Sequence, residues 1–349
     1  MVKQTRRCTK AHKRDVAERA DVSVTTVSHI INETRPVSDD LRQRVMTAMS
    51  ELGYQPNALA RSLRRKQTHT IGLIVPDSAN PFFAEVARGI EDASFEQDYS
   101  VILCNSDGDL SKELLYLNVL AEKQVDGILL VAVSGVTPEH LHTLQRRGPL
   151  LIVVDRDIPG VAVDSVLVDN ARGGWLATRH LLDRGHRRIG CITGPSDLTP
   201  SAERVVGYRQ VLQEAGLAPD ETLIVKGDFQ YESGYRAAHQ LLTMVDPPTA
   251  IFACNDLMAV GVISAALTLG RQVPADLSVV GFDDIPLASF TNPPLTTVAQ
   301  PKYEMGRLAA TLLLERLLKR DLPARRRLLD TELIIRQSTA PLKEFQDLN

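Results

Sequence analysis

The sequence predicts two kinds of structure in one chain: a small all-α unit at the N-terminus, and a large α/β body of two doubly wound, parallel-sheet lobes. Three short amphipathic helical patterns lie within residues 13–56. From residue 70 to residue 340, apolar runs rich in β-branched residues alternate with helical patterns. Such an alternation is typical of parallel sheets covered by helices on both faces. A chain of 349 residues is long enough for two or three such units.

The overall composition is that of a globular protein. Hydrophobic residues make up 44% of the chain, and no apolar run approaches the roughly 20 residues needed to span a bilayer. Residues 1–12 are basic but no apolar segment follows them, so we expect no secretory signal. The cysteines lie far apart, without CxxC spacing: Cys8, Cys104, Cys191 and Cys254. We therefore expect neither a metal site nor a disulfide, and a location in the reducing cytoplasm.

Charge is distributed unevenly along the chain. Residues 1–70 carry a net charge of +7, and the remainder carries −10. A basic head on an acidic body is expected when only the head contacts a polyanion such as DNA. A solvated basic tail would give the same imbalance, so the residue pattern inside the head has to distinguish the two interpretations.

The head contains the pattern of a helix-turn-helix unit. A short amphipathic helix is expected over Asp15–Ala20, followed by a tight turn at Asp21 and Val22. Ser23 can cap a second helix over Val24–Ile31. A third helix is expected after a cap at Ser38, and it would close the core with the following side chains: Leu41, Val45, Met49 and Leu52.

The second helix has the features of a DNA-reading helix. Val27, Ile30 and Ile31 supply its buried side, which leaves Thr25, Thr26, Ser28 and His29 facing outward. In a helix-turn-helix the second helix lies in the major groove, where short polar side chains approach base edges and phosphates closely. A three-helix unit that only packs, without binding DNA, is the alternative.

The segments DVAERADVSVTTVSHIIN (15–32) and RPVSDDLRQRVMTAMSELGYQPNALARSL (35–63) resemble the head of the lactose-repressor family, and are closest to its ribose- and purine-responsive branches. The resemblance extends from about Lys13 to about Ala340, and it implies a body like that of periplasmic binding proteins. It implies a helix-turn-helix domain (13–56), a hinge helix with linker (57–69), an effector-binding domain (70–340) and a tail (341–349). Residues 1–12 form a basic extension that has no place in the family pattern. Within the body, the first lobe is expected at 70–167 and 300–325, and the second at 168–299 and 326–340.

The same resemblance implies the residues that contact DNA. Val24, with a less polar side chain than many members have there, is expected to meet a thymine methyl. Leu63 is expected to insert between base pairs in the minor groove, which kinks the duplex. The full implied set is Ser23, Val24, Thr25, Thr26, Ser28, His29, Asn32, Asn57, Ala60, Leu63 and Arg64.

The body is expected to bind a small molecule between its lobes. The first series of strands ends at LLIVV (150–154), and a second begins at Val163–Val168. Ligands of doubly wound sheets bind in the crevice outside the carboxyl ends of the strands. Polar and aromatic residues follow many of these strands. Each alone is more often core or a helix cap, but together they are typical of a sugar site, where rings cover C–H faces and charged groups bind vicinal hydroxyls.

The resemblance to ribose-binding proteins and ribose repressors implies a specific ligand set: Asn80, Phe82, Phe83, Asp155, Arg156, Arg204, Phe229, Asn255, Asp283 and Gln300. Purine-responsive members have an arginine in the loop that corresponds to GPSDLT (194–199), where this chain has Leu198. This difference argues against a purine. Another pentose or a small hexose remains open at this point.

Two other classes of function fit the sequence less well. Phosphate-binding, metalloprotease and nucleophile-elbow motifs are absent from the sequence, which argues against an enzyme, and no cofactor is expected. A periplasmic sugar-binding protein would not need the helix-turn-helix head. The sequence thus predicts a repressor that binds a palindromic operator as a homodimer and responds to a sugar, most simply ribose as inducer. The tail (341–349) lacks leucine heptads, so a coiled-coil tetramer is not expected.

Overall fold

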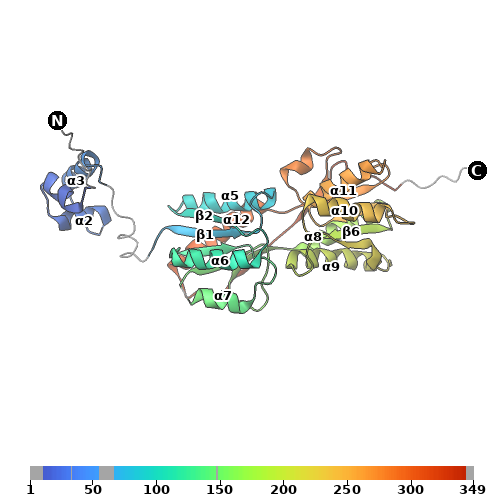
Figure 1. The fold of residues 1–349 in the computed structure, drawn as a ribbon, viewed down its shortest axis with the longest axis horizontal. Helices are drawn as coiled ribbons and strands as arrows, with labels where there is room; N and C mark the ends of the chain where they lie inside the picture. Colours follow the sequence, from blue (N-terminus) through green and yellow to red (C-terminus); the bar gives the residue numbers. More distant parts are fainter. Residues whose placement is uncertain (1–10, 33, 55–66, 147, 343–349) are drawn as a thin grey trace, which may run out of the picture. The chain divides into compact units, whose positions relative to one another are not determined.

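The structure is a computed structural model that describes residues 11–32, 34–54, 67–146 and 148–342. The chain divides into two compact units, Met1–Thr68 and His69–Asn349 (Figure 1). Among the described residues, no helix is both long and apolar enough to cross a membrane.

The first unit is a three-helix domain. Its helices are α1 (Lys13–Arg19), α2 (Val24–Asn32) and α3 (Asp39–Glu51). One small core joins them, and it is made of Val16, Ala17, Ala20, Val27, Ile30, Val45 and Ala48. Leu52, which was expected to close this core, is instead the C-cap of α3 and is 36% exposed. Ala48, three residues after Val45 and on the same face of α3, is the last buried residue of this helix.

The first lobe of the body is a parallel sheet between two helical layers. Its strands are β1 (Thr70–Val75), β2 (Ser100–Asn105), β3 (Gly127–Leu130), β4 (Leu150–Val154), β5 (Asp164–Val168) and β11 (Arg326–Leu329), in the order β11-β5-β4-β3-β1-β2. One face carries α5 (Pro81–Phe95) and α12 (Lys302–Leu318), and the other carries α6 (Leu110–Glu122) and α7 (Pro138–Gln145) (Figure 1). Helices cover both faces of the sheet because both faces of its strands are apolar. In β3, Ile128 and Leu130 enter one core while Leu129 enters the other.

The second lobe repeats this plan. Its strands are β6 (Ile189–Thr193), β7 (Ile224–Lys226), β8 (Ala250–Ala253), β9 (Ser278–Asp283), β10 (Thr296–Ala299) and β12 (Glu332–Ile334), in the order β12-β10-β9-β8-β6-β7. Only the β10–β12 pair among these is antiparallel. Its helices are α8 (Asn170–Asp183), α9 (Thr199–Glu214), α10 (Tyr231–Leu242) and α11 (Asp256–Thr268), with short 3-10 turns η1 (Glu221–Leu223) and η2 (Pro286–Ser289).

The chain crosses between the lobes at three places: after β5, after β10 and after β11. Two expectations from the sequence are corrected here. Strand β5, which was grouped with the second series, pairs with β4 and belongs to the first sheet, as the expected bounds of the first lobe (70–167) imply. Strand β11, expected in the second lobe from residue 326, pairs in parallel with β5, so the last crossing comes after Leu329. Both strands are short edge or near-edge elements, whose partners a sequence pattern does not specify.

Three helix pairs pack so closely that their backbones touch, and one of them is α10 with α11, at Gly234 and Gly261. A Cβ atom on Gly174 of α8 would lie 2.1 Å from the carbonyl oxygen of Arg204 of α9, and one on Gly207 of α9 would lie 2.0 Å from the carbonyl oxygen of Ala171. In the first lobe, α5 and α12 meet in the same way at Gly89 and Gly306. The positions of α9 and α12 are therefore fixed by backbone contact.

We predict that Gly207→Ala destabilises the second lobe. A methyl group there has no room beside Ala171, and overpacking of this kind costs about 1–3 kcal/mol, more than the helix propensity gained from alanine. Urea unfolding followed by the fluorescence of Trp175, the only tryptophan of the chain and a residue of α8, measures the effect. Ala202→Ser, at an exposed position of α9, is the control. A variant as stable as the wild type would contradict the close contact.

Candidate functional site

The outer face of α2 in the head presents most of the residues expected to read DNA. The Ser23 hydroxyl accepts a hydrogen bond from the Thr26 N–H at 2.9 Å and so caps the helix. Beyond this cap, Thr25 and Val24 are both exposed, Val24 by 46%. Thr26, Ser28 and His29 are half-buried.

One expected DNA contact lies on the inner side of α2. Asn32 is only 7% exposed, and its amide donates a hydrogen bond to the Ser28 carbonyl at 2.6 Å. Its side chain therefore faces the core and stabilises the last turn of the helix. Four further expected contacts fall on the hinge, outside the described residues: Asn57, Ala60, Leu63 and Arg64.

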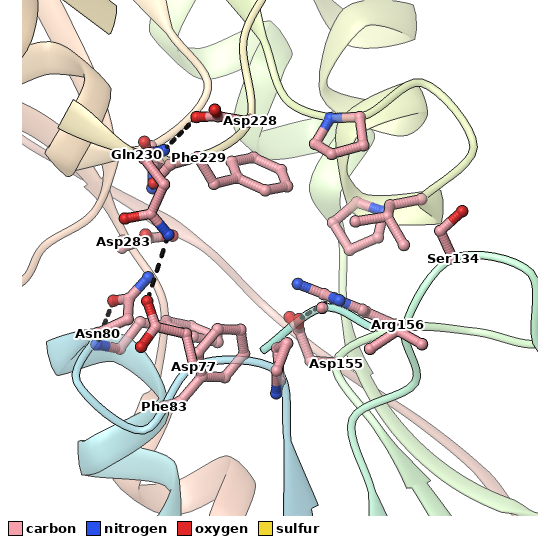
Figure 2. Close-up of a pocket in the computed structure, with 18 of the residues that line it drawn as sticks. Asp77, Asn80, Phe83, Ser134, Asp155, Arg156, Asp228, Phe229, Gln230 and Asp283 are labelled. Carbon is pink, nitrogen blue, oxygen red and sulfur yellow. Dashed lines mark hydrogen bonds and ion pairs between the residues drawn. The ribbon is translucent and has the colours of Figure 1, made fainter. Parts of the chain in front are cut away.

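A cavity of about 460 Å³ lies between the two lobes of the body, at the carboxyl ends of their strands (Figure 2). Nine of the ten expected ligand residues line it: Asn80, Phe82, Phe83, Asp155, Arg156, Arg204, Phe229, Asn255 and Asp283. Both lobes contribute, because the first lobe supplies the residues up to 156 and the second supplies the rest. Gln300 is not on the wall but lies behind Asp283, to which its amide donates a hydrogen bond at 2.7 Å.

Each buried cation of the cavity faces one carboxylate. In the second lobe, the guanidinium of Arg204 lies 3.7 Å from the Asp283 carboxylate. In the first lobe, Arg156 Nε lies 3.7 Å from Asp155. All four side chains are less than a tenth exposed. Neither pair is at hydrogen-bonding distance, so the carboxylates keep acceptor capacity for another donor.

Hydrogen bonds to the protein fix both guanidinium groups. Arg204 donates to Asn170 Oδ1 at 2.9 Å and to the Cys254 carbonyl, and its guanidinium stacks 3.7 Å from the Phe282 ring centre. Arg156 donates to the Ala132 carbonyl at 3.0 Å. The two cations are therefore preorganised, and they cannot swing out of the cavity without losing these bonds.

Burial shifts the titration of the carboxylates. It raises the pKa of Asp283 to about 7, although Arg204 and the amide of Gln300 favour the charged form. Burial likewise raises the pKa of Asp155, against the opposing effect of Arg156. The buried Asp155 Oδ1 and Gln300 Oε1 have no hydrogen-bond partner within the part of the chain that the structure describes. Asp155 on the wall and Gln300 behind it thus each have an acceptor oxygen without a donor, and ligand hydroxyl groups can supply such donors.

Aromatic rings from both lobes frame these charges (Figure 2). Phe82 and Phe83 pack edge to face, with ring centres 5.0 Å apart. On the other lobe, the Phe229 ring lies directly over Gly194, where a Cβ atom would come within 2.2 Å of the ring. Phe229 itself adopts φ +68°, a conformation that is strained for a bulky residue and is often found at binding sites.

The two asparagines of the set serve as helix caps. Asn80 Oδ1 accepts from the Phe82 N–H at 2.9 Å at the start of α5, and Asn255 Oδ1 accepts from the Met258 N–H at 2.9 Å at the start of α11. The Asn255 amide also donates to the Phe229 carbonyl at 2.9 Å. Asn255 therefore positions Phe229 as well as bordering the cavity.

Family models match both units. Residues 14–57 match the bacterial regulatory proteins of the lacI family, and residues 178–339 match the periplasmic binding protein-like domain. The ribose operon repressor of Escherichia coli K12 is 46% identical over 309 residues, which cover 88% of this chain and 93% of that protein. The chain belongs to the lacI family. Its head is therefore a DNA-binding domain of that family, and its body is the effector-binding domain.

Other members of the lacI family are similarly close. The HTH-type transcriptional repressor PurR of Photobacterium profundum is 43% identical over 94% of this chain and 98% of that protein. A lacI-family regulator from Enterococcus faecium, solved with bound ribose, is 34% identical over 78% of this chain and all of the other, with a TM-score of 0.73. The lac repressor dimer, solved on its operator, is 27% identical over 95% of this chain and all of the other, with a TM-score of 0.85.

Sequence reasoning missed several residues at the mouth of this lacI-family cleft. Asp77, Asp107, Ser134, Asp228 and Gln230 also line the cavity. Three of them, Asp77, Asp107 and Asp228, come two residues after a strand. The same attention to strand ends that pointed to Asp155 and Asp283 would have found these too. Gln230 Nε2 donates to Asp77 Oδ2 at 3.2 Å, and the Ser134 hydroxyl donates to Asp197. These two bonds join the lobes across the mouth.

We predict that Asp283→Asn stabilises the ligand-free protein at alkaline pH. Because folding raises the pKa of Asp283 to about 7, its contribution favours the folded state at low pH and is lost as the pH rises toward 7. Asparagine removes the buried charge and keeps an oxygen that accepts from Gln300. At pH 8 the Tm should exceed that of the wild type by about 2–4 °C per kcal/mol gained, and the difference should shrink at pH 6. A Tm lowered equally at both pH values would mean that the carboxylate stabilises the fold.

Proposed function

We propose that this lacI-family member is a transcriptional repressor that binds a palindromic operator as a homodimer and is released from it by ribose. The observation that carries the proposal is the cleft itself. Two buried, preorganised guanidinium groups and two carboxylates with spare acceptor capacity lie between phenylalanine rings of opposite lobes. Vicinal hydroxyls need such paired donors and acceptors, and the C–H faces of a sugar ring need aromatic surfaces.

Relatives support ribose among the sugars. The ribose operon repressor of Escherichia coli and the ribose-bound Enterococcus faecium regulator are both similar to this chain. The PurR relatives make a purine corepressor the second candidate. Against it stands Leu198, which borders the cavity where the resemblance implies an arginine in purine-responsive members.

Control of DNA binding would follow from closure of the cleft. A sugar that bonds to Asp155 of one lobe and Arg204 of the other draws the lobes together, and hinge motion of this kind is common in two-lobed binding proteins. If the closed form disfavours the DNA-bound arrangement of the heads, the affinity for operator falls by linkage, and operator lowers the affinity for sugar by the same factor.

Two observations support a homodimer, one about the head and one about the first lobe. The lac repressor relative is a dimer on its operator, and two heads are needed to read two half-sites. In the first lobe, the edge strand β2 exposes Ile102 (36%) and Leu103 (49%), and Leu115 of the adjacent α6 is 58% exposed. An apolar edge strand of this kind is normally covered, and we assign it to the contact between protomers.

We predict that Arg204→Ala and Asp283→Ala each weaken ribose binding more than tenfold. Each hydroxyl bonded to a charged group in the closed cleft contributes about 1.5–3 kcal/mol. Phe229→Ala should weaken binding as well, through loss of the ring contact. Calorimetric titration with ribose, other pentoses, glucose and hypoxanthine measures the effect. Arg209→Ala is the matched control, because Arg209 lies on the same helix but pairs with Glu221 at the surface.

The DNA response distinguishes an effector site from a structural one. The three cleft variants should bind an operator selected in vitro as tightly as the wild type, but ribose should no longer release them. The proposal fails if hypoxanthine or guanine binds tightly and no pentose does. It also fails if Asp283→Ala protein releases DNA at the wild-type ribose concentration.

We predict that a protein lacking residues 1–66 keeps ribose binding and loses operator binding. The reason is that the basic residues of the head and the exposed face of α2 all lie in the removed segment, while the cleft lies entirely in the body. Fluorescence anisotropy of labelled operator at several salt concentrations is the measurement, and the intact protein should show a steep salt dependence. Operator binding by the truncated protein would contradict this division of labour.

A further inference from the structure

The charge of the cleft lining is strongly unbalanced. Five aspartates line the cavity but only two cations do, Arg156 and Arg204. Both cations already face a carboxylate deeper in the cavity, since Asp155 faces Arg156 and Asp283 faces Arg204. Asp107 at the mouth forms an ion pair with Lys112. This leaves Asp77 and Asp228, and neither has an ion pair with any lysine or arginine of the described residues.

These two carboxylates lie at the mouth of the cleft on opposite lobes. Asp77 follows β1 of the first lobe, and Asp228 precedes Phe229 in the second lobe. Figure 2 shows Gln230 close to both of them. The Gln230 side chain donates to Asp77 at 3.2 Å, and its backbone N–H donates to Asp228 Oδ1 at 2.9 Å. Neutral amide groups therefore hold both carboxylates in place without offsetting their charge. Asp197, which accepts from Ser134, adds a third negative charge at this rim.

From this arrangement we infer that the cleft selects an uncharged sugar and excludes sugar phosphates, and that Asp77 and Asp228 determine this specificity. The inference rests on the proposal that the cleft binds a sugar. A phosphate inside the cavity would need a cation that is not already paired, and the lining offers none among the described residues. A phosphate at the mouth would meet two fixed carboxylates within the screening distance of about 10 Å at 0.1 M salt.

Repulsion of phosphate at the mouth, which we call the charge filter, would let a regulator distinguish a free sugar from its phosphate ester. Glucose and glucose 6-phosphate share every hydroxyl on the ring and differ only at the exocyclic oxygen, as do a ribofuranose and its 5-phosphate. Bonds to the ring hydroxyls alone therefore discriminate weakly between the members of such a pair. Repulsion of a like charge adds discrimination without any contact to the correct ligand. The regulator would then respond to a sugar before it is phosphorylated, and the kinase-type reaction that consumes the free sugar would end the signal.

The test compares neutral sugars with their phosphates on the full-length protein. Calorimetric titration with ribose and ribose 5-phosphate, glucose and glucose 6-phosphate gives the ratio of the two affinities for each pair. In the wild type, the neutral member of a pair that binds should bind at least about 100-fold more tightly. The double variant Asp77→Asn/Asp228→Asn should reduce this ratio at least tenfold, because asparagine keeps the shape and the acceptor oxygen but removes the charge. The ratio is the readout because any general effect on closure cancels in it.

Two controls separate charge from shape. Asp98→Asn removes an exposed carboxylate just before β2, at the amino ends of the strands and so at the end of the sheet away from the cleft, and should leave the ratio unchanged. Raising the salt concentration should lower the ratio in the wild type but hardly in the double variant. A ratio that neither the double variant nor salt alters would mean that phosphate is excluded by shape, and it would overturn the inference.

Other outcomes distinguish this inference from the proposed function. If ribose 5-phosphate binds the wild type as tightly as ribose, the charge filter is wrong and the ribose site stands. If glucose binds and ribose does not, the assignment of ribose is wrong, and glucose against glucose 6-phosphate still tests the filter. If no sugar of either pair binds, both proposals fall.

Discussion

The buried guanidinium of Arg204 is the group on which the effector site depends. An isolated charge in this interior would be very costly, so its partners have to be supplied by the fold. They come from three elements: Asn170 at the start of α8, the Cys254 carbonyl after β8 and Asp283 at the end of β9. The ring of Phe282 covers one face of the guanidinium at 3.7 Å. Because α9 touches α8 through its backbone at Gly174, Arg204 has little freedom to adjust its position.

Close helix packing and ligand recognition are thus linked in the second lobe. A carboxylate and a guanidinium held at 3.7 Å are too far apart to satisfy each other and too close to be independent. This spacing leaves both groups able to bond to a third, and the backbone contact of α8 with α9 maintains it. The first lobe repeats the arrangement with Asp155 and Arg156. On the proposal that the cleft binds a sugar, adjacent hydroxyls would complete the bonding of both pairs and give the ligand a differential affinity for the closed cleft.

The alternation of strands and helices predicted the two lobes and a crevice between them, and the family resemblance supplied the individual residues expected to line it. Parallel sheets place the carboxyl ends of their strands at a common edge, so residues after apolar runs come together even when they are far apart in the chain. Exceptions have equally physical causes. Asn32 has the pattern of a polar residue on an exposed helix face, but its amide caps the Ser28 carbonyl and faces inward. Strand β11 was expected in the second lobe but pairs with β5 in the first. The partner of a strand is set by tertiary contacts, and no local sequence pattern contains that information. Gln300 follows β10 as expected, yet it orients Asp283 from behind the wall.

The raised pKa values and the strained backbone of the cleft both lower the stability of the site. Asp283 with a pKa of about 7, the unpartnered Asp155 oxygen and Phe229 at φ +68° each make the ligand-free site less stable than an ordinary core. Sites that bind ligands commonly carry such costs, and the rest of the fold offsets them. A hydroxyl that donates to either carboxylate favours its charged form and lowers its pKa, so part of the cost is recovered only when the ligand is present. That recovery is confined to the closed cleft, where both lobes contact the ligand. If the cleft binds a sugar as proposed, these costs would make closure depend on the ligand as well as on the bonds at the mouth.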